Sequence, residues 1–109
     1  MKDNPEFSQS AMAQSAVEAS SYLRTLSNPA RLLLLCQLVD GPKRVGELEE
    51  ALDLGQAYVS QQLARLRADG LVSARKDGRI VHYSLADDRI VTLVNVLYDL
   101  FCSQPNADD

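Results

Sequence analysis

Residues 71–85, LVSARKDGRIVHYSL, restrict the possible folds more than any other stretch of this 109-residue chain. Asp77–Gly78 is a preferred two-residue hairpin turn, because a type I′ turn requires positive φ at both central positions. Alternate residues then form an apolar face that packs on the domain and a polar face that ends in a basic tip. The predicted pairs are Lys76–Arg79, Arg75–Ile80, Ala74–Val81, Ser73–His82 and Val72–Tyr83.

Two helical patterns begin the chain after a polar segment, residues 1–10, that we expect to be disordered. Apolar and small residues recur at helical spacing over about 11–25, and the small ones permit close approach to another helix. A second helix begins with Asn28 as N-cap and Pro29 at the first helical position, and runs to about Asp40. Its centre is apolar on nearly every side, so we expect it to be buried all round.

A helix-turn-helix and a terminal helix complete the pattern. A short helix over about 45–52 and a longer one over about 56–69 are joined by the turn DLGQ (53–56), and Val59, Leu63 and Leu66 form the inward stripe of the second. The last helix runs over about 87–103, followed by a tail at 104–109. The expected fold is mainly α with a β-hairpin wing: a winged helix-turn-helix over residues 11–103, with dimerisation helices at both ends.

The last helix is apolar over so much of its circumference that a single chain would cover it poorly. Large exposed apolar faces mark interfaces, and homodimers are the commonest closed assembly. We therefore expect a homodimer formed by the first and last helices. The expected interface residues are Met12, Ala16, Leu23, Val91, Val94 and Tyr98.

The charges are segregated along the chain. The net charge is −4, but residues 56–82 are basic while the acidic residues collect elsewhere. A helix fits the major groove of DNA, and a basic hairpin tip reaches phosphates or the adjacent minor groove. This pattern favours double-stranded DNA as a partner.

Other classes of function find little support. The longest apolar runs fall far short of the roughly 18 residues that a membrane span needs, and the N-terminus has no apolar signal segment. We therefore expect a cytoplasmic protein, in which two cysteines are more often free or redox-active than joined in a structural disulfide. A single histidine and no phosphate-binding glycine loop favour a protein that is not an enzyme and has no cofactor.

The segments LSNPARLLLLCQL, VGELEEALDLGQAYVSQQLARLRADGLV and RKDGRIVHYSL resemble the ArsR-type winged-helix repressors of bacteria, over about residues 20–103. The resemblance implies a homodimer that binds operator palindromes and is released by an inducer. Three positions depart from the common family form of the recognition segment, since Gly55 and Ala57 replace serines and Gln62 replaces a histidine.

The recognition segment and wing supply the expected DNA contacts. Amide side chains pair with adenine edges, whereas arginines more often bind phosphates, which fix position rather than sequence. The expected base-reading residues are Gln56, Ser60 and Gln61. The expected phosphate or wing contacts are Tyr58, Arg65, Arg67, Arg75, Lys76 and Arg79, with Tyr58 also able to contact a thymine methyl group.

The resemblance also bears on the inducer. The metal-sensing members carry Cys-Val-Cys-Asp-Leu where this chain has Arg44 to Leu48, and a second metal motif, Asp-x-His, where it has Asp87, Asp88 and Arg89. Both sets of ligands are lost, so we expect no metal site. Cys36 and Cys102 instead resemble the cysteine pair of the persulfide-sensing (SqrR- and BigR-like) branch.

In that branch, reactive sulfur species join the two thiols through extra sulfur atoms, the protein releases DNA, and sulfide-handling genes are expressed. Two alternatives remain open. The pair could form a direct disulfide in response to peroxide or electrophiles, or the protein could bind DNA constitutively with inert cysteines, since a cysteine in an apolar stripe is often only a small hydrophobic residue. The sequence places no basic residue close to either cysteine, so nothing in the pattern predicts a lowered thiol pKa.

Overall fold

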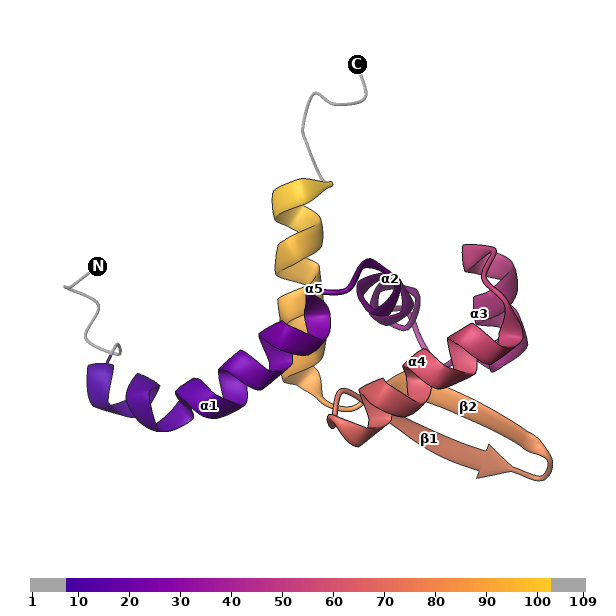
Figure 1. Ribbon diagram of the computed structural model, residues 1–109, viewed down its shortest axis with the longest axis horizontal. Coiled ribbons are helices and arrows are strands. Elements are labelled where there is room, and N and C mark those ends of the chain that lie inside the picture. Colours follow the sequence, from indigo (N-terminus) through magenta and orange to yellow (C-terminus); the bar gives the residue numbers. More distant parts are fainter. Residues whose placement is uncertain (1–7, 103–109) are drawn as a thin grey trace, which may run out of the picture.

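The computed structural model describes residues 8–102. Residues 1–7 of the predicted disordered segment 1–10, the predicted tail 104–109 and Ser103 lie outside this range, while Gln9 and Ser10 are helical. Five helices and one hairpin make up this described part of the chain (Figure 1). They are α1 (Gln9–Leu26), α2 (Pro29–Gln37), α3 (Val45–Leu52), α4 (Gln56–Ala68), β1 (Val72–Asp77), β2 (Ile80–Leu85) and α5 (Asp88–Phe101). This order confirms the winged helix-turn-helix. The first helix begins two residues before the predicted start of the domain.

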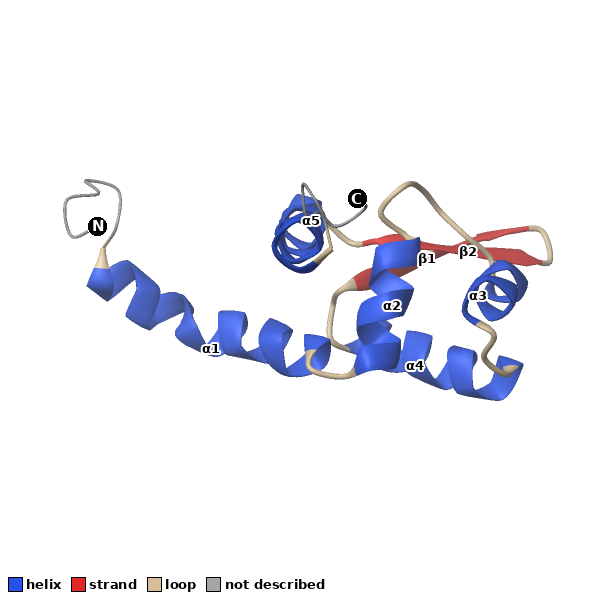
Figure 2. Cartoon of the chain, turned by 90° about the horizontal axis from the view of Figure 1, so that it is seen from above, coloured by secondary structure: helices blue, strands red, loops and turns tan. Residues whose placement is uncertain are grey.

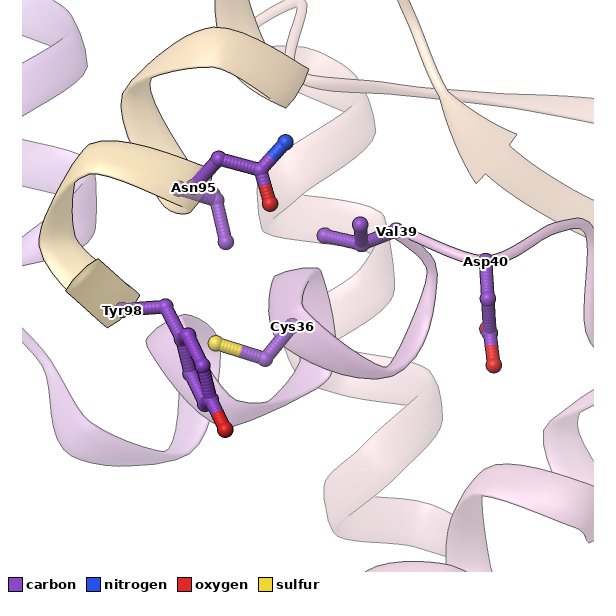
Figure 3. A pocket seen from close by; sticks show the side chains of 6 residues that line it. Cys36, Val39, Asp40, Asn95 and Tyr98 are labelled. Carbon is purple, nitrogen blue, oxygen red and sulfur yellow. The ribbon is translucent and has the colours of Figure 1, made fainter. Parts of the chain in front are cut away.

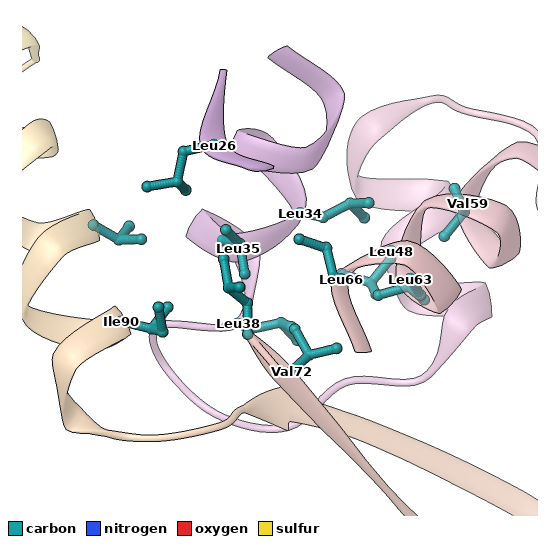
Figure 4. Packing of buried hydrophobic residues seen from close by; sticks show 12 residues of the cluster. Leu26, Leu34, Leu35, Leu38, Leu48, Val59, Leu63, Leu66, Val72 and Ile90 are labelled. Carbon is teal, nitrogen blue, oxygen red and sulfur yellow. The ribbon is translucent and has the colours of Figure 1, made fainter. Parts of the chain in front are cut away.

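The core lies where α2 meets α3, α4, α5 and the base of the hairpin (Figure 4). The inward side of α2 is formed by Leu34, Leu35 and the C-cap residue Leu38. These leucines pack against the inward residues of α4, which are Val59, Leu63 and Leu66 as predicted. Leu48, Leu71, Val72, Ile90 and Val94 complete this cluster with Leu26. One continuous core therefore holds α4, the hairpin and α5 in fixed positions relative to one another.

The second helix is shorter and less buried than predicted. Asn28 caps it by accepting a hydrogen bond from the backbone N–H of Arg31 at 3.0 Å, as expected. The helix ends at Gln37, and the chain reaches Gly41, at φ +138°, through turns. Leu33 is 49% exposed and Cys36 is exposed, so the expectation of burial all round was wrong. The reason is that the other elements cover only one face of α2.

The helix-turn-helix matches its prediction closely. The bounds of α3 are those predicted, and α4 ends at Ala68, one residue early, because Asp69 serves as its C-cap before Gly70 at φ +82°. Asp53 adopts φ +57° in the turn between the two helices. Seen from above, α4 runs along one edge of the domain with α2 and α3 on its inner side, and no described element covers its outer side (Figure 2).

The hairpin closes one position later than predicted. Gly78 and Arg79, not Asp77 and Gly78, are the central residues of the turn, and Gly78 alone has positive φ, +67°. This is the pattern of a type II′ turn with glycine first, so Asp77 stays in the strand.

The observed pairs are Val72–Leu85, Ser73–Ser84, Ala74–Tyr83, Arg75–His82, Lys76–Val81 and Asp77–Ile80, which replace the predicted ones. The predicted apolar and polar faces of the hairpin are confirmed, because each residue pairs with a partner two positions from the predicted one and so stays on the same face.

Candidate DNA-binding surface and thiol pair

The expected base-reading residues lie together on the uncovered side of α4. Gln56, Ser60 and Gln61 are all exposed, while Val59 between them points into the core and is fully buried. This alternation arises because residues three and four apart share a helix face. Tyr58, also on α4, is 40% exposed. The helix thus presents amide and hydroxyl groups to solvent from a rigid support.

The expected phosphate contacts extend this surface onto the hairpin. Arg75, Lys76 and Arg79 are exposed on the wing, and Arg67 is exposed on α4. Arg65 is different, because its Nε donates to Asp69 Oδ2 at 2.9 Å, so one side of its guanidinium already has a partner.

Gln62, the residue that replaces the family histidine, does not face solvent freely. Its Oε1 accepts a hydrogen bond of 3.2 Å from Nη1 of Arg31 on α2, and Nε of Arg31 donates to the backbone oxygen of Thr25 at 2.9 Å. Sequence reasoning missed this link, although a family histidine replaced by another hydrogen-bonding side chain was a signal for it.

His82, the only histidine, lies half-buried on β2 opposite Arg75. Its Nδ1 is buried without a hydrogen-bond partner. Among residues 8–102, no group of three histidine, cysteine, aspartate or glutamate side chains is placed to hold a metal ion.

Cys36 lies at the edge of a pocket between α2 and α5. The pocket has a volume of about 310 Å³, and its lining residues are Cys36, Val39, Asp40, Val94, Asn95 and Tyr98. Figure 3 shows the Cys36 sulfur pointing toward the Tyr98 ring, with Asn95 on the neighbouring turn of α5. Tyr98 is one turn before Cys102, whose backbone N–H donates to the backbone oxygen of Tyr98 at 2.7 Å.

The two thiols interact electrostatically. Partial burial raises the pKa of Cys36 above its ordinary value, and the nearby Cys102 raises it further, because two thiolates repel each other. Both cysteines are free and exposed. The fold therefore brings together two residues that are 66 positions apart, and it holds Cys36 largely as the thiol at neutral pH.

The terminal helices carry most of the predicted interface residues on their surfaces. Met12, Ala16, Leu23 and Tyr98 are exposed and Val91 is half-buried. Val94 is an exception, since it is only 2% exposed and packs in the core of its own chain. Its assignment to an interface was wrong, because the last helix uses that face to cover α2.

Arg89, which replaces the metal-binding histidine of the family motif, instead joins α5 to α1. Its guanidinium lies 3.2 Å from Glu18 Oε2 and 2.9 Å from the Tyr22 hydroxyl, and 5.1 Å from the centre of the Tyr22 ring. It also contacts Asp87, the N-cap of α5, at 3.3 Å. A cation–π contact and an ion pair thus occupy the position where the family motif would place a metal ligand.

Comparison with known proteins agrees with this geometry. Residues 28–74 match the domain described as "Bacterial regulatory protein, arsR family". The chain is 42% identical over 106 residues to the "Biofilm growth-associated repressor" of Xylella fastidiosa (strain Temecula1), covering 95% of this chain and 93% of the relative. It is 38% identical to the "Transcriptional activator HlyU" of Vibrio cholerae, covering 84% of each.

A solved structure extends the comparison to three dimensions. The crystal structure of the transcriptional repressor BigR from Xylella fastidiosa superposes with a TM-score of 0.83 at 42% identity, covering 90% of this chain and all of that one. None of the helices in the described range is long and apolar enough to cross a membrane. By sequence and by structure, the chain belongs to the arsR family of bacterial transcriptional regulators and has the winged helix-turn-helix fold of that family.

Proposed function

We propose that this protein is a homodimeric repressor that binds operator DNA and releases it when persulfides join Cys36 to Cys102. The observation that carries the proposal is the thiol pair: two elements far apart in sequence bring the two cysteines of the described chain close enough for one to raise the pKa of the other. Similarity to proteins named as repressors supports the DNA-binding part.

DNA binding follows from the uncovered side of α4 and from the wing. Gln56, Ser60 and Gln61 are placed to read base edges in the major groove, because amide and hydroxyl groups match the donors and acceptors exposed there. The exposed cations of the wing and of α4 bind phosphates and so fix the register. Two such units related by a two-fold axis read a palindromic site.

The chemistry needs no oxidant beyond the persulfide itself. One thiolate attacks the outer sulfur of a first persulfide, takes that sulfur and releases the parent thiol. The resulting cysteine persulfide attacks the inner sulfur of a second persulfide and expels hydrosulfide. The other cysteine thiolate then attacks the middle sulfur of this mixed trisulfide and expels the second parent thiol. Two protein thiols and two persulfides thus yield one trisulfide bridge, two small thiols and one hydrogen sulfide.

The pocket beside Cys36 supports this sequence of steps. It lies between the helices that carry the two thiols, and its volume of about 310 Å³ leaves space for added sulfur atoms and for the departing thiol. A bridge longer than a disulfide tolerates a greater separation of the two backbones, since a direct disulfide requires Cα atoms within about 7 Å.

Bridging affects DNA binding through the elements that it joins. Cys36 is in the helix that packs on α4, whereas Cys102 ends the helix expected at the dimer interface. A covalent link between them favours one pose of the recognition helices over another. The coupling free energies typical of such transitions are about 1–3 kcal/mol, which corresponds to about 5- to 150-fold in DNA affinity.

The test compares the Cys36→Ser and Cys102→Ser variants with the unmodified protein. Each is reduced, treated with glutathione persulfide, and titrated onto a DNA duplex that the protein itself has selected from a random pool. We expect the unmodified protein to lose affinity and each variant to keep it. Normal DNA release by either variant would contradict the proposal.

The competing functions give different results in the same assay. Loss of affinity after peroxide treatment, with a bridge that contains no added sulfur, would indicate a thiol-disulfide sensor. Affinity that no thiol reagent changes would indicate a constitutive DNA-binding protein with inert cysteines.

A further inference from the structure

Thr25 is the only buried polar side chain among residues 8–102, with 1% of its surface exposed. It lies at the end of α1, yet its hydroxyl Oγ1 is 2.7 Å from Oδ2 of Asp69, the C-cap of α4. The backbone oxygen of Ser21 is farther, at 3.1 Å. Because a hydroxyl has one proton and a carboxylate only accepts, Thr25 donates to Asp69.

The same carboxylate oxygen has a second partner on the recognition helix. Arg65 Nε donates to Asp69 Oδ2 at 2.9 Å. The pKa of Asp69 lies below its ordinary value, first because of the Thr25 hydrogen bond and then because of Arg65. The carboxylate is therefore charged at neutral pH and holds a hydroxyl from α1 on one side and a guanidinium from α4 on the other.

The backbone of Thr25 makes a second connection to the recognition helix. Its oxygen accepts from Nε of Arg31, and Nη1 of Arg31 donates to Gln62 on α4. One residue of α1 is thus connected to α4 at two places, near the middle of the helix and at its end. This position differs from the thiol pair and from the Arg89 contacts, so neither of those explains it.

We propose that Thr25 and Asp69 are positioning residues: they orient the Arg65 guanidinium for a DNA phosphate and make that orientation depend on the position of α1. This inference rests on the proposed DNA-binding function. A guanidinium has five N–H donors, and within residues 8–102 only Nε of Arg65 is engaged, so its other donors are kept for a bidentate phosphate contact. Orienting it in advance reduces the entropy lost on binding.

The dependence on α1 follows from where Thr25 lies. The helix carries exposed apolar residues expected at the dimer interface, including Met12 and Leu23, and Thr25 is in its last turn. A shift of α1 relative to α4 lengthens a 2.7 Å hydrogen bond and frees the Asp69 carboxylate from its fixed position. Thr25, Asp69 and Arg65 therefore connect the arrangement of the two subunits with the phosphate contact of each.

The test is a double-mutant cycle with Thr25→Val and Arg65→Ala, read out as DNA affinity against salt concentration. A mixed-sequence duplex of about 30 base pairs serves as the probe, because phosphate contacts do not depend on sequence. Arg65→Ala is expected to lower the magnitude of the salt slope by about 1.8 per dimer, at about 0.9 per phosphate contact. Thr25→Val is expected to lower it in the same direction, with affinity reduced about threefold or more.

The cycle separates positioning from general structural damage. If Thr25 acts through Arg65, the double variant binds no more weakly than Arg65→Ala alone, and Thr25→Ser, which keeps the hydroxyl, restores normal binding. Ser27→Ala is the matched control, because the Ser27 hydroxyl donates to the backbone oxygen of Arg24, a residue of its own turn, and forms no hydrogen bond with α4 in the described structure. If Thr25→Val does not fold, Asp69→Asn takes its place in the cycle.

Three results would overturn the inference. The first is a Thr25→Val effect that adds in full to that of Arg65→Ala, and the second is an unchanged salt slope in Thr25→Val. An Arg65→Ala slope equal to that of the unmodified protein would also overturn it, but would leave the proposed DNA-binding function intact as long as wing substitutions still reduce the slope. Loss of the proposed function itself would appear as no binding to selected or mixed DNA.

Discussion

Neutralising the wing should change how strongly DNA affinity depends on salt. Each subunit places Arg65 and Arg67 on α4, and Arg75, Lys76 and Arg79 on the hairpin, at exposed positions. A dimer therefore offers at most about ten phosphate contacts, which predicts a slope of log affinity against log salt near −9. Doubling the salt from 0.1 to 0.2 M would then weaken binding by about 500-fold.

The perturbation is the triple substitution of Arg75, Lys76 and Arg79 by alanine. Only the α4 contacts remain, so the expected slope falls to about −3.6 and the same salt step weakens binding by only about 12-fold. The chain has a net charge of −4, and so its overall charge cannot supply this dependence. The attraction must come from the basic surface alone.

Fluorescence anisotropy of a labelled duplex, measured at four or five salt concentrations, gives the slope directly. Arg24→Ala is the control, because it removes one positive charge from an exposed position of α1, away from the wing. Its effect on the slope is compared with one third of the effect of the triple substitution, which removes three. A triple variant whose slope equals that of the unmodified protein would refute the placement of the wing against DNA. A reduced slope in Arg24→Ala would show that net charge, not location, governs binding.

Three further predictions concern the thiols, the core and the turn. In Cys102→Ser, the pKa of Cys36 should fall but stay above its ordinary value, because burial is the main cause of its raised pKa. The pH profile of Cys36 alkylation by iodoacetamide should therefore shift to lower pH. An unshifted profile would mean that the two thiols are too far apart to interact. Leu63→Ala, at a fully buried position, should lower the free energy of unfolding by about 2–5 kcal/mol in urea titrations, whereas Leu33→Ala, at a half-exposed one, should cost much less. Gly78→Ala forces a side chain onto φ +67° and should cost about 1–2 kcal/mol in thermal unfolding, while Gly46→Ala, within α3 and without a close neighbour, should not destabilise the protein.

The sequence predicted the elements well because their signals are local. The Asn28 cap, the inward stripe of α4 and the bounds of α3 all depend on residues within a few turns of one another. The hairpin was found for the same reason, but its turn was predicted one position too early, so every predicted strand partner was wrong by two residues. Asp-Gly is compatible with more than one turn type, so the local sequence does not decide the register alone. Lys43, which is distant in sequence, also pairs with Tyr83 of β2, and the local pattern does not contain this contact.

Tertiary contacts account for what the sequence could not predict. An apolar helix pattern does not show which face its neighbours cover, so Cys36 was expected to be buried with the rest of its helix and Val94 to lie at an interface, whereas the structure leaves Cys36 exposed and buries Val94 in the core. The contacts of Arg89 with α1 and of Thr25 with Asp69 join residues 44 to 71 positions apart. No periodicity in the sequence reports such pairs.

Intact-protein mass spectrometry of the reduced protein after exposure to glutathione persulfide, with DNA affinity measured on the same sample, tests the proposed mechanism most directly. A single added sulfur in the bridge raises the mass by about 30 Da, while a direct disulfide lowers it by about 2 Da. We predict the heavier species, with Cys36 and Cys102 joined in one peptide pair and DNA affinity reduced, and no such species after peroxide treatment. An unchanged mass, or a bridged protein that binds DNA as tightly as the reduced one, would contradict the proposal that this thiol pair is the sensor.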